Sequence, residues 1–247
     1  MNFVLTFQHF FYLCINFCIT SLYSIMFEKL MNLPLLQGIS QATLASLVEK
    51  YPFHFLKYRK GDTIIHQGED CSHLKFVISG RVVATFLNPH IKVEISQEIE
   101  APEVITPDYL FGRSTAYPCK VVAETDCGIL QIPKAVYVKM IQNEEVLLFN
   151  ILNYLSRNSQ NRLWTFSSKS SGKFTTRLAI MTYELTTKKS ENIKFTFKQK
   201  DHCMLLGIRR TSLFTSLEEL KQKGIIHYTQ NEIHILNRRD LINMIHK

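Results

Sequence analysis

The segment that decides the fold is "YRKGDTIIHQGEDCSHLKFVISGRV", Tyr58–Val82. Short runs of β-branched and aromatic residues alternate in it with glycines at Gly61, Gly68 and Gly80. Because glycine adopts the positive φ angles of tight turns without steric cost, this pattern predicts short strands joined by turns. The flanking residues extend the same character over Phe53–Asn88.

Two later segments predict more strands of the same kind. "IKVEISQEI" (Ile91–Ile99) has a period of two, which places Ile91, Val93 and Ile95 on one face. "KVVAETDCGILQI" (Lys120–Ile132) reads as two short strands. Short strands at regular intervals predict a small antiparallel β-barrel or β-roll. Ahead of them, helical spacing of leucines follows a plausible N-cap, Ser40.

After the strands, Asn143–Phe166 predicts a long helix whose first turn carries two glutamates. Its apolar residues cover more than one narrow stripe, so we expect it to pack against two partners. One is its own β-roll, and the favoured second partner is the same helix of another subunit in a twofold dimer. Burial within one subunit remains the alternative. The expected dimer contacts are Leu148, Leu152 and Leu155.

The N-terminus is unusual because Asn2–Phe27 holds no Asp, Glu, Lys or Arg. This run is long enough to cross a bilayer, but it lacks the basic start and small-residue cleavage site of a secretory signal. Three interpretations stay open. The favoured one is a mis-assigned start, with Met26 or Met31 as the physiological first residue. The others are a membrane anchor over residues 3–27 and a helix docked on the protein.

Charge is distributed unevenly over the 247 residues, whose formal net charge is +8. Residues 173–247 carry 14 Lys/Arg against 7 Asp/Glu, a net of +7, which leaves +1 for residues 1–172. This asymmetry favours a polyanionic partner that docks at one end, although a basic surface without a partner is also consistent with it. The six cysteines form no C-x-x-C and are typical of a reducing cytoplasm.

The basic third begins after a linker, Ser167–Lys173. A helix (Phe174–Thr186), a strand (Ile193–Phe197) and two segments joined at Gly207 are expected after it. The second of these segments belongs to "LGIRRTSLFTSLEELKQKGII", in which three leucines at i, i+4 and i+7 form a buried side. This is the proportion of a helix-turn-helix. A two-stranded hairpin, Ile225–Tyr228 with Glu232–Leu236, then completes a winged form.

The N-terminal residues of such a second helix meet base edges when the helix enters the major groove. Arginine there opposes the helix macrodipole, and a phosphate or a base acceptor would compensate. Ordinary solvated arginines are the alternative interpretation. The residues expected to contact DNA are Arg209, Arg210, Thr211, Ser212, Thr215 and Lys200.

Together these motifs resemble the Crp/Fnr family of bacterial transcription regulators. The resemblance rests on the glycine-punctuated Tyr58–Val82, on "LFG" at Leu110–Gly112, on "VVAETDCGILQI" and on the closing winged helix-turn-helix, in that order. It implies an α+β fold, with a jelly-roll-like antiparallel β-roll, a dimerisation helix and a winged helix-turn-helix. It further implies a homodimer on a pseudo-palindromic double-stranded DNA element, with RNA polymerase as a further partner. Arg210 then matches the base-reading arginine by its offset from Gly207.

The effector segment departs from the cyclic-nucleotide binders of that family. Arg113 stands where they place a Glu for the ribose, and Tyr117 and Pro118 stand where an Arg-Ser pair would hold the phosphate. The resemblance therefore implies an effector other than cyclic AMP bound in the usual way, and no cofactor is predicted. Cys14 and Cys18 do not supply an iron–sulfur cluster. The candidate effector pocket is Phe111, Gly112, Arg113, Ser114 and Thr115.

The expected organisation is an apolar start (1–26), a β-roll domain (27–142), a dimerisation helix (143–168) and a DNA-binding domain (169–247). Enzymatic motifs such as a nucleophile elbow or a phosphate loop do not occur, so we do not expect an enzyme. The predicted function is that of a cytoplasmic, sequence-specific transcription regulator. The alternative function is a membrane-tethered ligand sensor that uses the β-roll as its binding module.

Overall fold

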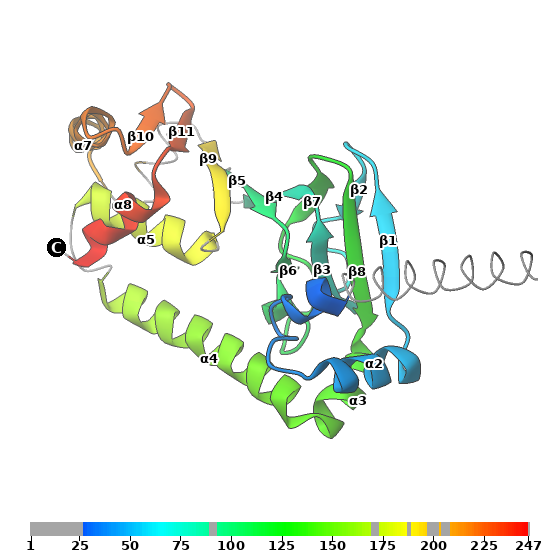
Figure 1. The fold of residues 1–247 in the computed structure, drawn as a ribbon. Coiled ribbons are helices and arrows are strands. Elements are labelled where there is room, and N and C mark those ends of the chain that lie inside the picture. The colour runs from blue at the N-terminus through cyan, green and yellow to red at the C-terminus, as the bar shows by residue number, and fades with distance from the viewer. Residues whose placement is uncertain are drawn as a thin grey trace, which may run out of the picture.

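The computed structural model describes residues 27–88, 93–168, 173–186, 189–196, 203 and 208–246 (Figure 1). Its α-helices are α2 (Gln41–Lys50), α3 (Lys134–Asn143), α4 (Glu145–Ser168), α5 (Phe174–Leu185), α7 (Arg210–Gln222) and α8 (Arg238–Asn243), with 3-10 turns at Pro107–Tyr109 and Met244–His246. Its strands are β1 (His54–Tyr58), β2 (Thr63–Ile65), β3 (His73–Ser79), β4 (Arg81–Asn88), β5 (Val93–Glu100), β6 (Glu103–Ile105), β7 (Lys120–Ala123), β8 (Cys127–Pro133), β9 (Ser190–Thr196), β10 (Ile226–Tyr228) and β11 (Glu232–Ile235).

The predicted β-roll is confirmed. One sheet has the strand order β1-β8-β3-β6, and the second continues through β5-β4-β7-β2, with antiparallel pairing throughout. The two sheets enclose an apolar core whose largest fully buried side chains include Phe76, Tyr117 and Tyr137. We call β1–β8 together with α2 and α3 the roll.

Glycines make the turns of the roll, as the sequence predicted, with φ angles of +93° at Gly61, +86° at Gly68 and +79° at Gly80. Gly80 is also a point of close approach. A Cβ atom there would lie 2.5 Å from the backbone oxygen of Asp126 and 2.9 Å from Cβ of Cys127. The β3–β4 turn can therefore pack against the β7–β8 turn only because residue 80 has no side chain.

The helices at the edge of the roll are partly as expected. Ser40 caps α2, and its hydroxyl accepts a hydrogen bond from the Thr43 amide at 3.1 Å. The sequence analysis missed α3, which runs from β8 to the long helix α4. The amide of Asn150 on α4 donates to the backbone oxygens of Leu35 (3.2 Å) and Gln37 (2.7 Å), which ties α4 to the segment before α2.

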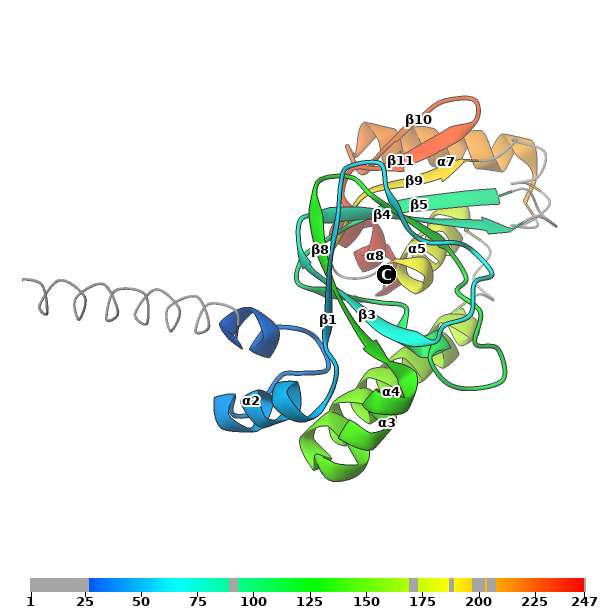
Figure 2. The same cartoon turned by 90° about the vertical axis from the view of Figure 1, so that its right-hand side faces the viewer.

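The last third forms a second unit, which we call the winged unit: α5, β9, α7, β10, β11 and α8. It has a separate apolar core that includes Phe174, Leu178, Phe195 and Ile233. The predicted helix, strand and hairpin are present, with small shifts at their ends, and the sequence analysis did not predict α8. Figure 2 shows β10, β11, β9, β5 and β4 following one another, so the winged unit and the roll share one seven-stranded sheet.

The apolar start, residues 1–26, lies outside the described residues, so the three interpretations of it stay predictions. Among the residues that are described, no helix has both the length and the apolar character needed to cross a membrane.

We predict that Gly80→Ala destabilises the protein by about 2–4 kcal/mol, because a positive φ and a backbone clash coincide there. Gly61→Ala is the matched control. Its φ of +93° is equally unfavourable for alanine, but its Cβ would meet nothing within 4 Å. That variant should lose only about 1–2 kcal/mol. Urea unfolding measures both, and equal losses would contradict the close approach at Gly80.

Candidate functional site

The helix α7 presents a polar N-terminal surface above a buried apolar side. Leu213, Leu217 and Leu220 are buried, as the sequence predicted. Arg209 is the N-cap residue, with extended backbone angles, and its carbonyl accepts the first helical hydrogen bond from the Leu213 amide at 3.0 Å. Arg210 opens the helix. All of the predicted DNA contacts that lie within the described residues are exposed: Arg209, Arg210, Thr211, Ser212 and Thr215.

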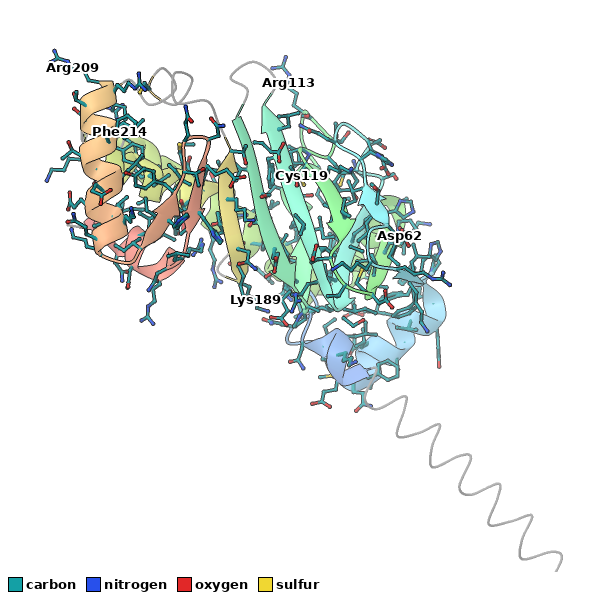
Figure 3. The ribbon with its side chains drawn as sticks, turned by 90° about the horizontal axis from the view of Figure 1, so that it is seen from above. Asp62, Arg113, Cys119, Lys189, Arg209 and Phe214 are labelled. Atoms are coloured by element: carbon teal, nitrogen blue, oxygen red, sulfur yellow. The ribbon has the colours of Figure 1, made fainter. Side chains whose placement is uncertain are left out.

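Two of these side chains make contacts within α7. The guanidinium of Arg210 lies over the ring of Phe214, 5.7 Å from its centroid, one helical turn away. Such a cation–π contact limits the freedom of the arginine without burying its N–H donors. The hydroxyl of Thr215 donates to the carbonyl of Thr211 at 3.1 Å and keeps its acceptor lone pairs for an incoming donor. Figure 3 shows Arg209 at the tip of α7, pointing away from the protein.

The turn after α7 and the strand β10 contact the C-terminal half of this helix. Gly224 has a φ of +66° and lets the chain turn after the helix, and the Ile225 amide donates to the Leu220 carbonyl at 3.0 Å. Tyr228 on β10 donates its hydroxyl hydrogen bond to the carboxylate of Glu218 at 2.9 Å. This bond to a carboxylate raises the pKa of Tyr228. These contacts therefore fix the C-terminal end of α7, which lies away from the exposed arginines.

The first helix of the predicted helix-turn-helix is mostly outside the described residues. Lys200 and Gly207 both fall there, so the expected phosphate contact of Lys200 stays a prediction. Cys203 is described, is half-buried and packs against the core of the winged unit.

The candidate effector pocket occupies the segment between the 3-10 turn and β7. Gly112, Arg113 and Ser114 are exposed, and Phe111 and Thr115 are half-buried. Arg113 points outwards at the edge of the roll (Figure 3). The ring of Phe111 lies 5.4 Å from the ammonium of Lys134. The five residues form a continuous surface segment, and whether they bind an effector remains a proposal.

Beneath this segment, Tyr117 fills the interior of the roll. It is 1% exposed, and its hydroxyl donates to the carbonyl of His73 at 2.8 Å. The ammonium of Lys75 lies 5.5 Å from its ring centroid, and Lys75 is itself buried. Burial lowers the pKa of Lys75 and raises the pKa of Tyr117. The position that the family resemblance links to a phosphate-binding arginine thus carries a packed, uncharged phenol.

The helix α4 carries an exposed apolar stripe. Its members are Phe149 at 59% exposure, Leu152 at 47% and Val146 at 41%. Of the expected dimer contacts, Leu152 lies on this stripe, whereas Leu148 and Leu155 are half-buried and Leu155 packs against the roll. The sequence analysis did not assign Val146 and Phe149 to the interface. The spacing of three residues, from Val146 to Phe149 and from Phe149 to Leu152, is the signal that could have found them.

Comparison with known sequences gives a family match and a curated relative. Residues 55–144 match the family of the cyclic nucleotide-binding domain. The chain is 32% identical over 109 residues to the cAMP-activated global transcriptional regulator CRP of Haemophilus influenzae, which is 44% of this chain and 48% of that protein. The match therefore spans about half the length of this curated relative.

Two solved structures match the chain at low sequence identity. The sensor domain of the transcriptional regulator DNR from Pseudomonas aeruginosa matches with a TM-score of 0.50 at 19% identity, over 57% of this chain and 92% of that one. The catabolite activator protein of Thermus thermophilus matches with a TM-score of 0.49 at 16% identity, over 86% of this chain and 97% of that one. At this identity, the match to the sensor domain supports the fold of the roll alone.

We predict that Tyr117→Phe costs about 1–2 kcal/mol of stability, because it removes a buried hydrogen bond to the His73 carbonyl. Tyr137→Phe is the matched control. Tyr137 is also fully buried, and its hydroxyl has no hydrogen-bond partner among the described residues. Removing that hydroxyl should leave stability unchanged or raise it by up to about 1 kcal/mol. Thermal unfolding measures both variants. Unchanged stability in Tyr117→Phe together with a loss of stability in Tyr137→Phe would refute the assigned hydrogen bonding.

Proposed function

We propose that the chain is a sequence-specific, DNA-binding transcription regulator. The match of residues 55–144 to the cyclic nucleotide-binding domain family and the resemblance to the Crp/Fnr regulators support this proposal. The observation that carries this proposal is the exposed N-terminal surface of α7, Arg209–Ser212 with Thr215, on a helix whose opposite side is buried. Such a helix can enter the major groove with its donors outward.

Arg209 and Arg210 are assigned different roles in this proposal because of their positions. Arg210 is inside the helix and stacked on Phe214, which suits a side chain that must reach a base edge in one orientation. A guanidinium can bridge O6 and N7 of guanine. Arg209 precedes the helix, so it suits a phosphate at the groove edge. Thr211 and Thr215 complete the proposed base contacts.

The proposed active form is a homodimer through α4. Support comes from the exposed stripe Val146, Phe149 and Leu152, because three neighbouring apolar side chains on one helix face are costly to leave in water. A twofold axis would place the same stripe of a second copy opposite, and two α7 helices would then read two half-sites. RNA polymerase is the further partner expected of such a regulator.

The proposed effector is not cyclic AMP in the usual binding mode. Tyr117 supports this, because the family resemblance puts it in the place of the phosphate-binding arginine and its ring is buried in the roll interior beside Lys75. Arg113, in the place of the ribose-binding carboxylate, is exposed and cationic. A cation there would favour an anionic group on any ligand that contacts Phe111–Thr115.

We predict that Arg210→Ala removes about 1–3 kcal/mol of discrimination at one base pair of each half-site, because a bidentate base contact is lost. Arg209→Ala should weaken all duplexes about equally and lower the salt slope by about 1. Fluorescence anisotropy against cognate and single-substitution duplexes, at several salt concentrations, separates the two effects.

Arg239→Ala is the charge-matched control for both arginine variants, because Arg239 is exposed on α8 rather than α7. It should change neither discrimination nor the salt slope appreciably. If the wild-type protein binds every duplex with equal affinity at physiological salt, the proposed function is wrong.

We predict that Leu152→Lys weakens dimerisation at least about tenfold, because the twofold axis places the charge at the interface twice. Leu87→Lys is the control, since Leu87 is 45% exposed, almost as much as Leu152, but lies on β4. Sedimentation equilibrium measures the dimer constant. A monomeric wild type, or an equal effect of the two variants, would contradict dimerisation through α4.

A further inference from the structure

Two histidines lie close together at the starts of β1 and β3. His54 is the first residue of β1 and His73 the first residue of β3, and β8 lies between these two strands (Figure 1). His54 is opposite Gln131 of β8 in the strand register, and His73 is opposite Pro133. Because residues two apart on a strand point to the same face of the sheet, both histidine side chains leave the sheet on one face, over β8.

The two imidazole rings are near enough for one metal ion to contact both. Their centroids are 6.4 Å apart, and their planes are tilted by 44°. Zinc–nitrogen bonds are about 2.0–2.1 Å long, so two imidazoles on one zinc ion have their centroids about 5–6 Å apart. His54 is exposed, so a small change of its side-chain torsions brings its ring into this range.

Ser72 orients one of the two rings. Its hydroxyl oxygen lies 2.8 Å from Nδ1 of His73. In the tautomer in which Nδ1 donates this hydrogen bond, the lone pair of Nε2 is left for a ligand. Metal-binding histidines in proteins usually donate their other ring N–H to a fixed oxygen, which sets the tautomer and the ring orientation. The pair Ser72 and His73 has this arrangement.

The main chain at His73 is also held in place. The Ser72 carbonyl accepts a hydrogen bond from the Lys134 amide at 2.9 Å, and the His73 carbonyl accepts one from the Tyr117 hydroxyl at 2.8 Å. A half-buried ring on a fixed backbone loses little conformational freedom when it binds a ligand. His73 is therefore the preformed half of the pair, and His54 is the adjustable half.

The charged groups around His73 have opposite signs. Lys75 and Glu69 both interact electrostatically with it. The ammonium of Lys75 lies 5.5 Å from the ring centroid of Tyr117, and Lys75 is buried. One carboxylate oxygen of Glu69 accepts a hydrogen bond from the His66 amide at 3.1 Å. Because these two charges oppose each other, the imidazoles themselves decide the chemistry, and neutral imidazole is the commonest metal ligand in proteins.

We propose that His54 and His73 bind one divalent transition-metal ion, of the kind represented by Zn²⁺, on the face of the sheet over β8. Imidazole nitrogens suit zinc, copper and nickel. The ion ties β1, an edge strand of its sheet, to β3. The described residues contain no group of three or more His, Cys, Asp or Glu side chains placed to hold a metal, so water or another molecule fills the remaining positions. This site does not depend on the proposed function.

The first test is isothermal titration calorimetry of the full-length protein with zinc chloride. Ser72→Ala keeps both rings but removes the orienting hydroxyl, so it should weaken the zinc affinity up to about tenfold. His54→Ala and His73→Ala each remove a ligand and should weaken it more than Ser72→Ala does. His66→Ala is the matched control, because His66 is an exposed histidine in the turn before β3. It should bind zinc as the wild type does.

The second test measures hydrogen exchange of the β1 amides, which zinc bound elsewhere on the chain should not change. At a free zinc concentration of about ten times Kd, β1 should exchange about tenfold more slowly in the wild type and in His66→Ala, because opening of β1 breaks the site. His54→Ala and His73→Ala should show no such slowing. Without zinc, His54→Ala should exchange as the wild type does, which shows that this variant is folded.

Equal zinc affinity in the wild type and in both variants of the pair, or an equal loss in His66→Ala, would overturn the site. Zinc binding without slower exchange of β1 would overturn the bridge between the two strands. Inorganic phosphate is the probe for the competing occupant, an anion held by His54, His73 and Lys75. If phosphate slows β1 exchange and zinc does not, this face binds anions and the metal assignment is wrong.

Discussion

The pairing of β5 with strands on both of its edges is the constraint on which the arrangement of the molecule depends. A strand at the edge of a sheet leaves a row of backbone donors and acceptors unpaired. In this chain β9 of the winged unit occupies that edge, and Gln97 and Ser190 place buried polar groups beside the ladder. The orientation of the winged unit, and of α7 within it, thus follows from main-chain hydrogen bonding, which permits few alternative registers.

Close approach of backbone segments is the second constraint, and it shapes the roll. Gly80 lets two turns meet where a Cβ atom would not fit. Tyr117 then fills the interior and bonds to the His73 carbonyl. With Lys75 buried against its ring, this interior resembles a packed core more than a polar cavity for a phosphate. This packing is consistent with the proposal that the effector is not cyclic AMP in the usual binding mode.

Much of the fold could be predicted from local patterns in the sequence. The glycines of Tyr58–Val82, the Ser40 cap and the three leucines of α7 each depend on neighbours within a few residues, and each was predicted correctly. The strand β6 was missed because its three residues are too few to show a period. The β5–β9 pairing could not be predicted, because strand partners far apart in sequence leave no local signature.

Among the candidate site residues, those of α7 could be placed from sequence because an amphipathic helix with a buried leucine side must expose the other side. Exposure of Val146 and Phe149 depends on how α4 lies against the roll, which the pattern of α4 alone does not decide. Likewise, the family resemblance identified Tyr117 as a departure, but only the fold reveals that its ring is buried beside Lys75. Lys200 lies outside the described residues and stays a prediction.

The measurement that tests the central claim most directly is selection of bound sequences from a pool of random duplex DNA by the purified protein. A dimer that presents two copies of α7 predicts enrichment of a single motif made of two inverted half-sites at one fixed spacing. Enrichment of no motif, or of unpaired half-sites at every spacing, would contradict the account of a regulator whose recognition helices are oriented by the shared sheet.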